Sequence, residues 1–350
     1  MLFSNWVTFA RIVAKLGFVV TSFSSTLFMI LTIFYVKEKV GSYRYLLLLL
    51  PITGFFFASF EYLIDPFFHS YNKGFTLFRM SSFERFSLEA NTFILACYVA
   101  LYGSTIAILA LQFAYRYWAV FRPRYIRMLF DGPRFICPIF YVSIGAFCWL
   151  GASMIFNMPD NYSLEYLGTD ILEKYGVILS EQPTLVLVAY GREGSLRIQN
   201  SFGLLIMCMF LSGQYGIIIY CAVVMGLKMQ KKLSVLSLKV QRMHRQFYHA
   251  LILQITTPTV TLFFPVFILY LVPFLDIEIS FPTGTCLSAF ALYPGLDILI
   301  MIYIASYYTQ ALKDFLKTIT CRTWKKLKHE KTPKSKAVNS TANSTAVSSI

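Results

Sequence analysis

The residues of this chain that could carry chemistry are single charged groups inside long apolar stretches. Asp297 lies three residues after Pro294, and Glu61 lies near the end of an earlier apolar run. Arg116 follows a third run, between two tyrosines. A charged side chain at lipid depth costs about 2.5–3.5 kcal/mol on insertion scales, so it should face protein or water. Pro294 also removes a backbone donor and can kink a helix beside the acid.

Enzymatic function has no positive support in the sequence. Phosphate-binding loops, HExxH, GxSxG and the kinase motifs are all absent. The seven cysteines include no CxxC pair, and the four histidines are scattered, which argues against a metal site or a disulfide framework. We therefore expect no catalytic residue, no metal and no cofactor.

The composition points to a membrane protein. The chain is 57% hydrophobic and 14% charged, with a net charge of +14. A basic chain can bind nucleic acid, but here the charges lie in the gaps between apolar runs rather than along a soluble face. The lipid bilayer is therefore the expected partner, and nucleic acid is not.

Seven apolar runs are long enough to cross a bilayer, which predicts an all-α bundle of seven transmembrane helices. We expect residues 1–11 to be a short outer terminus, 12–308 the bundle, 309–329 an amphipathic cytoplasmic helix and 330–350 a disordered tail. Cys321 in the amphipathic helix is either palmitoylated or a free thiol. The expected spans are 12–36, 46–64, 90–115, 135–156, 200–226, 250–273 and 285–308.

The distribution of basic residues predicts the orientation. Of the 31 Lys and Arg residues, 23 lie in the segments that share a side with the carboxyl terminus. The positive-inside rule then places that terminus in the cytoplasm and the amino terminus outside, at the plasma membrane. The sequon at Asn161 falls in an outer loop and could be glycosylated.

Each charged residue has a structural interpretation beside the functional one. Arg116 either holds an inactive helix packing and then meets a G protein, or snorkels toward the inner headgroups; position alone favours snorkelling. Asp297 and Pro294 form either a polar hinge, which we favour, or a hydrogen-bonded buried acid. Glu61 could be a clamp, a ligand group or an interfacial residue, and its place near the span end favours the interface.

A set of short motifs carries a family resemblance. They are Gly41-Ser42-Tyr43-Arg44-Tyr45-Leu46, Glu61 with Pro66 and His69, Tyr115-Arg116-Tyr117 with Pro123, Leu253-Gln254 with Pro258-Thr259 and Pro265, and Tyr293-Pro294-Gly295-Leu296-Asp297. Together they resemble the nematode serpentine chemoreceptors of the Str and Srj type. The resemblance implies a G-protein-coupled receptor for odorants or other small environmental molecules, in the cilium of a sensory neuron. Compared with rhodopsin-like receptors, the long outer loop lacks a cysteine, so its fold must be held in another way.

Hypothetical roles follow for several residues. A ligand cavity among spans three, five, six and seven would use Tyr98, Tyr102, Phe210, Gln214, Phe267, Tyr270 and Phe290. Coupling to a heterotrimeric G protein would use Arg116, Lys231, Lys232, Arg242 and Arg245. Bending during activation would use Pro258, Pro265, Pro294 and Asp297.

Two other functions stay open. A ligand-gated cation channel of seven-span chemosensory subunits would have its amino end inside, which the charge bias opposes. A transporter would need polar sites near the bilayer midplane, where only Asp297 comes close.

Overall fold

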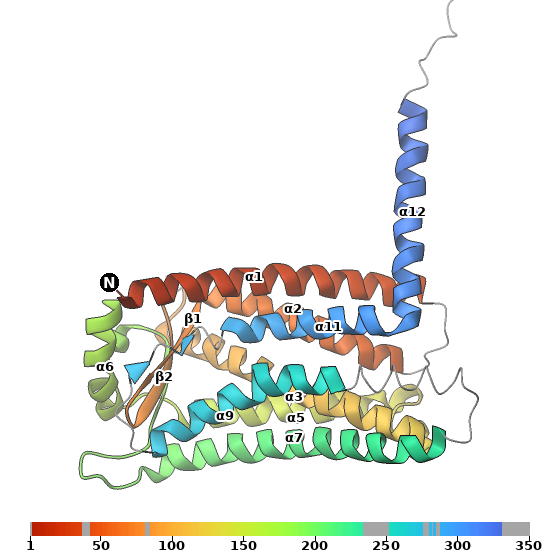
Figure 1. Ribbon diagram of the computed structural model, residues 1–350. Helices are drawn as coiled ribbons and strands as arrows, with labels where there is room; N and C mark the ends of the chain where they lie inside the picture. The colour runs from red at the N-terminus through yellow and green to blue at the C-terminus, as the bar shows by residue number, and fades with distance from the viewer. Residues whose placement is uncertain are drawn as a thin grey trace, which may run out of the picture.

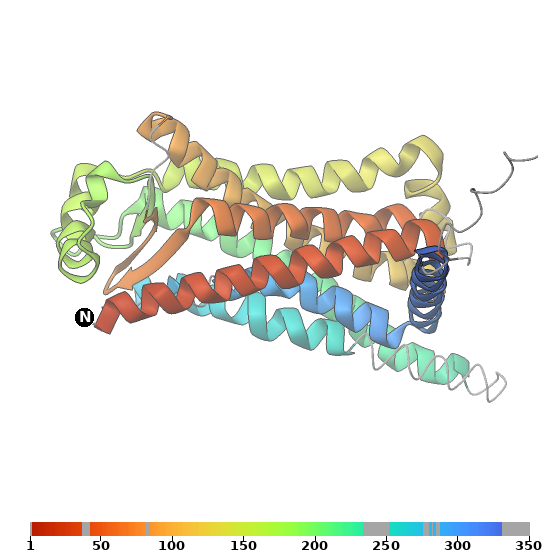
Figure 2. The ribbon, with the colours of Figure 1, turned by 90° about the horizontal axis from the view of Figure 1, so that it is seen from above.

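The apolar runs form long helices that lie side by side in a bundle (Figures 1 and 2). The computed structural model describes residues 2–36, 43–80, 85–233, 252–275, 280–281, 283–284 and 288–330. Six helices in this part are long and apolar enough to cross a membrane, and the bent pair Ala289–Ile304 and Ser306–Thr320 brings the number to seven when it is counted as one span. The prediction of a helical seven-span bundle is confirmed. Its first five spans are α1 (Leu2–Ile30), α2 (Tyr43–Ile64), α3 (Leu88–Phe121), α5 (Ile136–Phe156) and α7 (Ile198–Leu233).

Spans six and seven are irregular. Span six is helical over residues 252–258, then forms the π-helix η4 (Thr259–Phe263) and the helix α9 (Phe264–Leu271). Pro258 precedes the π-helix and Pro265 lies in the first turn of α9, so the irregular turn falls between two prolines. Span seven combines the 3₁₀ turn η6 (Ala289–Leu292) with α11 (Tyr293–Ile304).

The first helix starts earlier than the sequence predicted. α1 begins at Leu2, whereas we expected the span to begin at residue 12. The reason is tertiary packing, because Val7 and Ala10 are buried against residues of the loops at that end of the bundle. The first residues are therefore an extension of span one and contribute to the structure at that end.

The loops at one end of the bundle form a β-sheet that the sequence analysis did not predict. β1 (Pro66–Tyr71) and β2 (Gly74–Arg79) make a hairpin, β3 (Thr184–Val188) comes from the long loop, and β4 (Ser280–Phe281) comes from the loop between spans six and seven. The strand order is β3-β2-β1-β4, and all neighbours are antiparallel. We call this sheet, with the helix α6 (Asn161–Tyr175), the cap. It lies at the end of the bundle where α1 begins (Figure 1).

Both faces of the cap sheet are buried. Alternate residues of a strand point to opposite faces, and here each face has its own apolar core. Phe67, Phe78 and Val186 pack with α6 and the start of α1. Phe68, Phe75 and Leu187 pack with the core of the bundle. The cap is therefore continuous with the membrane domain.

The last helix turns sharply away from the bundle. α12 (Ser306–Glu330) makes an angle of 91° with span seven, and the bend falls at Ala305, which has an extended backbone (Figure 1). Tyr308 fixes the start of α12, because its ring stacks on Phe28 at 4.5 Å and its hydroxyl is 2.8 Å from the Thr32 hydroxyl. A helix is thus present where the sequence predicted the amphipathic segment. The tail beyond Glu330 and the Cys321 side chain lie outside the described residues.

Candidate functional site

A buried polar cluster joins spans three, six and seven. Arg116 is 7% exposed, and its Nη1 donates to Gln254 Oε1 at 2.5 Å. Its Nη2 lies 3.5 Å from Met301 Sδ on α11. The guanidinium is 5.6 Å from the ring centroid of Phe113, one helical turn away. We call Arg116, Gln254, Asp297 and Met301 the polar lock, because one cation holds three helices.

This placement corrects one prediction. The snorkelling interpretation of Arg116, which position favoured, is wrong because the side chain points into the bundle and its donors are bonded there. An arginine is a good centre for such a lock, since its planar head has five donors and stays charged. Sequence reasoning also gave Gln254 no role in the site. Its signal is similar to that of Asp297: a strongly polar side chain within an apolar run of span length.

Asp297 completes the lock from α11. Its side chain is 1% exposed, the Gln254 amide interacts with it, and the Arg116 charge acts on it. Within the described residues, its Oδ1 accepts no hydrogen bond. Pro294 lies in the first turn of α11 and packs on α2, where a Cβ added at Gly54 would lie 2.4 Å from Pro294 Cβ. Span seven thus packs closely on α2 at Pro294 and carries a polar side chain one turn later. That this segment acts as a hinge stays a prediction.

An aromatic cluster lies between the polar lock and the cap. Four of the predicted ligand residues, Tyr98, Tyr102, Tyr270 and Phe290, are buried in one core. Tyr102 stacks on Phe290 at 5.4 Å, and Trp149 of α5 stands between Tyr102 and Tyr270 at 5.0 and 6.2 Å. The Tyr102 hydroxyl donates to the Leu262 carbonyl at 3.2 Å. That carbonyl belongs to the π-helix, so the cluster is bonded to the irregular turn of span six.

The remaining predicted ligand residues are placed differently. Phe210 borders the cluster and packs over Gly145, where an added Cβ would lie 2.9 Å from its Cζ. Gln214 accepts a hydrogen bond from the Tyr141 hydroxyl, so its carbonyl is engaged within the bundle. Phe267 is 43% exposed on the outside of α9 and is not brought into the cluster.

The basic residues predicted for coupling are only partly described. Lys231 and Lys232 lie in the last turn of α7, at the end of the bundle opposite the cap (Figure 1). Their side chains, together with Arg242 and Arg245, lie outside the described residues. Their role stays a prediction.

The Glu61 side chain does not lie on the surface of the bundle, where an interfacial residue would be expected from its position near the span end. It is 1% exposed in the part of α2 next to the cap, with the hydroxyls of Tyr98 and Ser288 as its polar neighbours. Neither carboxylate oxygen accepts a hydrogen bond with good geometry among the described residues, and the Tyr98 hydroxyl has no such partner either. The sequence showed that the acid was unusual but could not show that α3 and span seven would cover it.

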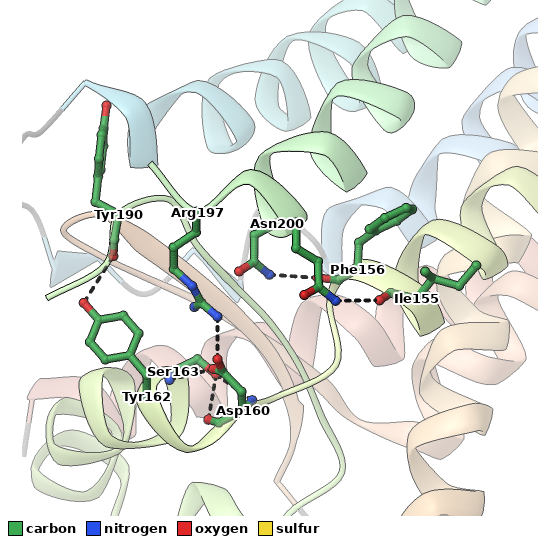
Figure 3. Close-up of polar contacts among 9 residues, drawn as sticks. Ile155, Phe156, Asp160, Tyr162, Ser163, Tyr190, Arg197 and Asn200 are labelled. Atoms are coloured by element: carbon green, nitrogen blue, oxygen red, sulfur yellow. Dashed lines mark hydrogen bonds and ion pairs between the residues drawn. The ribbon is translucent and has the colours of Figure 1, made fainter. Parts of the chain in front are cut away.

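The long loop between α5 and α7 is held by hydrogen bonds and an ion pair rather than by a disulfide (Figure 3). Asp160 caps α6 reciprocally with Ser163, and its carboxylate pairs with Arg197 at 2.5 Å. The Tyr162 hydroxyl donates to the Tyr190 carbonyl at 3.1 Å. Asn200, in the first turn of α7, donates to the carbonyl of Phe156 at 2.8 Å. These contacts join α5, α6 and α7 and meet the expectation that the loop is fixed without cysteine.

A second polar network lies between α6 and the hairpin. His69 of β1 is fully buried; its Nε2 is 2.7 Å from Asp170 Oδ2, and its Nδ1 is 2.8 Å from the Tyr175 hydroxyl. Because a carboxylate only accepts, Nε2 carries the proton and Nδ1 accepts from Tyr175. Lys174 also pairs with Asp170 at 2.5 Å. Burial lowers the pKa of His69 to about 4, against the opposing pull of Asp170. His69 is therefore neutral at pH 7.

Two further predictions concern modification and metals. Asn161 is exposed in the first turn of α6 and so is accessible to glycosylation, which stays a prediction. Among the described residues, no three His, Cys, Asp or Glu side chains are grouped as a metal site would require.

Comparison with known proteins gives the family. The profile of the serpentine type 7TM GPCR chemoreceptor Str family matches residues 10–313. The chain is 31% identical to the Caenorhabditis elegans G-protein coupled receptor str-33 over 87% of this chain and 90% of that protein. It is 26% identical to the serpentine receptor class r-10 protein of the same nematode, over 80% of this chain and 83% of that one. This family is a receptor class and not an enzyme class. The chain is therefore a multi-pass membrane protein that belongs to the Str family of serpentine seven-transmembrane chemoreceptors.

Proposed function

We propose that this chemoreceptor binds a small environmental molecule and activates a heterotrimeric G protein by repacking its helices. The observation that carries the proposal is the polar lock, in which Arg116 bonds Gln254 and touches Met301. It sits near the end of α3 that is remote from the cap. A bond set between three spans at that end has two discrete arrangements, closed and broken, as a switch requires.

The aromatic cluster supports a path from ligand to lock. A molecule that displaces Tyr102 acts on the Leu262 carbonyl, because the two are bonded. Leu262 lies in the π-helix between Pro258 and Pro265, and Gln254 lies one turn before Pro258 on the same span. A ligand that fits the state with the altered turn better shifts the population toward the broken lock.

The charge distribution supports a membrane orientation and a cytoplasmic partner for this receptor. We place the cap outside the cell and α12 along the inner leaflet of the plasma membrane of a sensory cilium. The basic end of α7, with Lys231 and Lys232, and the basic loop that carries Arg242 and Arg245 would meet the G protein once the lock opens. Arg116 would then exchange Gln254 for a group of that partner.

The first test measures coupling. Cells expressing the full chain with a promiscuous G protein are exposed to a panel of volatile compounds, with intracellular calcium as the readout. Tyr102→Phe removes the hydroxyl that bonds Leu262 and keeps the ring, so it should weaken the response about tenfold at equal surface expression. Tyr303→Phe is the matched control, because Tyr303 is 84% exposed. Equal responses from both variants would refute the path through Tyr102.

The second test separates the receptor from a cation channel of seven-span subunits. An amino-terminal tag on intact cells should be reached by antibody without permeabilisation. A tag that is reached only after permeabilisation would remove the receptor proposal and favour the channel, whose amino end lies inside.

A further inference from the structure

Glu61 is a buried acid for which the described part of the chain supplies no cation. Its side chain is 1% exposed, and neither oxygen accepts a well-formed hydrogen bond there. A carboxylate removed from water without a partner is strongly destabilised, whereas a cation that binds it recovers much of that energy. The position is therefore poised for a positively charged group.

Two arginines that contact the end of α2 have other partners. Arg11 pairs with Asp65 at 2.7 Å. Arg79 is buried, and its Nε donates to the Ile64 carbonyl while its Nη1 donates to Asn91. The outer loop that leads to Ser288 contains no Lys or Arg between residues 274 and 288. The sequence of that loop thus has no cation to offer Glu61.

The groups around the carboxylate match one kind of cation. The hydroxyls of Tyr98 and Ser288 both face it, and the Tyr98 hydroxyl has no hydrogen bond among the described residues. With the carboxylate, they make three acceptors for the three donors of a primary ammonium. Phe57 stacks on Tyr98 at 5.1 Å, and both rings are buried. Aromatic rings beside a carboxylate are suited to an ammonium and its alkyl substituent.

We propose that Glu61, Tyr98 and Ser288 form the recognition site for a small primary amine. The inference deepens the proposed function, because the amine is taken to be the receptor's ligand. The ammonium binds at Glu61 while its apolar part extends toward Tyr102 and Phe290, which belong to the same core as Tyr98. Glu61 is covered, so the amine binds a more open member of the ensemble and stabilises it.

The experiment uses binding rather than signalling. The purified full chain in lipid nanodiscs is unfolded thermally with millimolar phenethylamine or isoamylamine, and with the alcohols 2-phenylethanol and isoamyl alcohol as neutral partners. Each amine should raise the midpoint more than its alcohol does. Glu61→Gln keeps the shape and removes the charge, so it should weaken the apparent affinity for the amines tenfold or more, about the contribution of one charged hydrogen bond. Glu89→Gln, at an exposed acid in the first turn of α3, should change nothing.

A second variant tests the site in case Glu61→Gln impairs folding. Tyr98→Phe keeps the ring on Phe57 and removes one acceptor, so it should weaken amine binding by a smaller factor. Amines that stabilise Glu61→Gln as well as the wild type, or no better than their alcohols, would overturn the inference. If the alcohols bind and raise calcium while the amines do not, the amine site is refuted and the receptor function is retained. Amine binding without any calcium response would support the site and remove the proposed function instead.

Discussion

His69 makes the cap sensitive to acid, and the structure gives the sign and size of the effect. The imidazole is buried between β1 and α6, where Asp170, Lys174 and Tyr175 are its charged and titratable neighbours. Burial lowers its pKa from 6.5 to about 4, while Asp170 opposes this change and Lys174 adds to it. Protonation would also place a second donor at Nδ1, facing the Tyr175 hydroxyl that now donates to it.

The free energy follows from linkage. We call the cap closed when the hairpin packs on α6 and buries His69, and open when the two have separated. Above pH 6.5 His69 is neutral in both forms, so it adds no pH dependence to the stability of the closed cap. As the pH falls from 6.5 toward 4, the open form binds a proton and the closed form does not, so the closed cap loses stability. Below about 4 both forms are protonated and the loss is complete. Each pKa unit corresponds to about 1.4 kcal/mol, which gives a total loss of about 3 kcal/mol over this interval.

Hydrogen exchange of the β1 and β2 amides, corrected for the intrinsic effect of pH, measures this opening. Protection of the hairpin should fall by about a hundredfold across the interval, the equivalent of about 3 kcal/mol. His69→Gln cannot titrate and should show a much flatter dependence, from a lower starting protection. Wild-type protection that is constant over this range, or a variant with the same slope, would show that burial does not set the protonation of His69.

Two further variants test the bundle. Arg116→Ala should abolish calcium signalling while surface expression is kept, because the lock loses its cation. The control Arg122→Ala, at the exposed end of α3, should signal normally. Normal signalling from Arg116→Ala would remove that residue from the mechanism. Gly103→Ala should destabilise the receptor by about 1–3 kcal/mol, since the new Cβ would lie 2.5 Å from Trp149 Cδ1. Gly151→Ala on α5 meets nothing within 4 Å and is the control; equal thermal midpoints for the two variants would refute the packing argument.

Hydropathy sufficed to predict the spans, because each apolar run forms its helix largely through local contacts. The β-sheet of the cap could not be found in this way. In the sequence, Phe67 and Phe78 are aromatic residues of a polar loop. They pair with each other in the hairpin, but Phe78 also pairs with Thr184 of β3, more than a hundred residues later. Val7 and Ala10 extend α1 for the same reason, since the surface that buries them exists only after the cap has formed.

For the candidate site, residue type was a better guide than orientation. The sequence identified Arg116, Asp297 and Glu61 as unusual, but it could not show that Arg116 and Glu61 face the interior. It also grouped Phe267 with Tyr270, although the structure places only Tyr270 in the aromatic cluster. The π-helix between Pro258 and Pro265 determines which side of α9 faces the aromatic cluster, and a π-helix cannot be predicted from apolar composition.

The short strand β4 at the edge of the cap sheet determines where the cap should separate first. β1 and β2 connect spans two and three, and β3 joins them to the segment between spans four and five, so most of the rim at this end of the bundle is one hydrogen-bonded plate. Within the described residues, the connection between spans six and seven pairs with this plate as a strand at two positions, Ser70 with Phe281 and Tyr71 with Ser280. Thr283 adds side-chain hydrogen bonds to Ser70 and to the Phe68 carbonyl. When the rim parts, it should part along this seam, and the spans released are the two that carry Gln254 and Asp297.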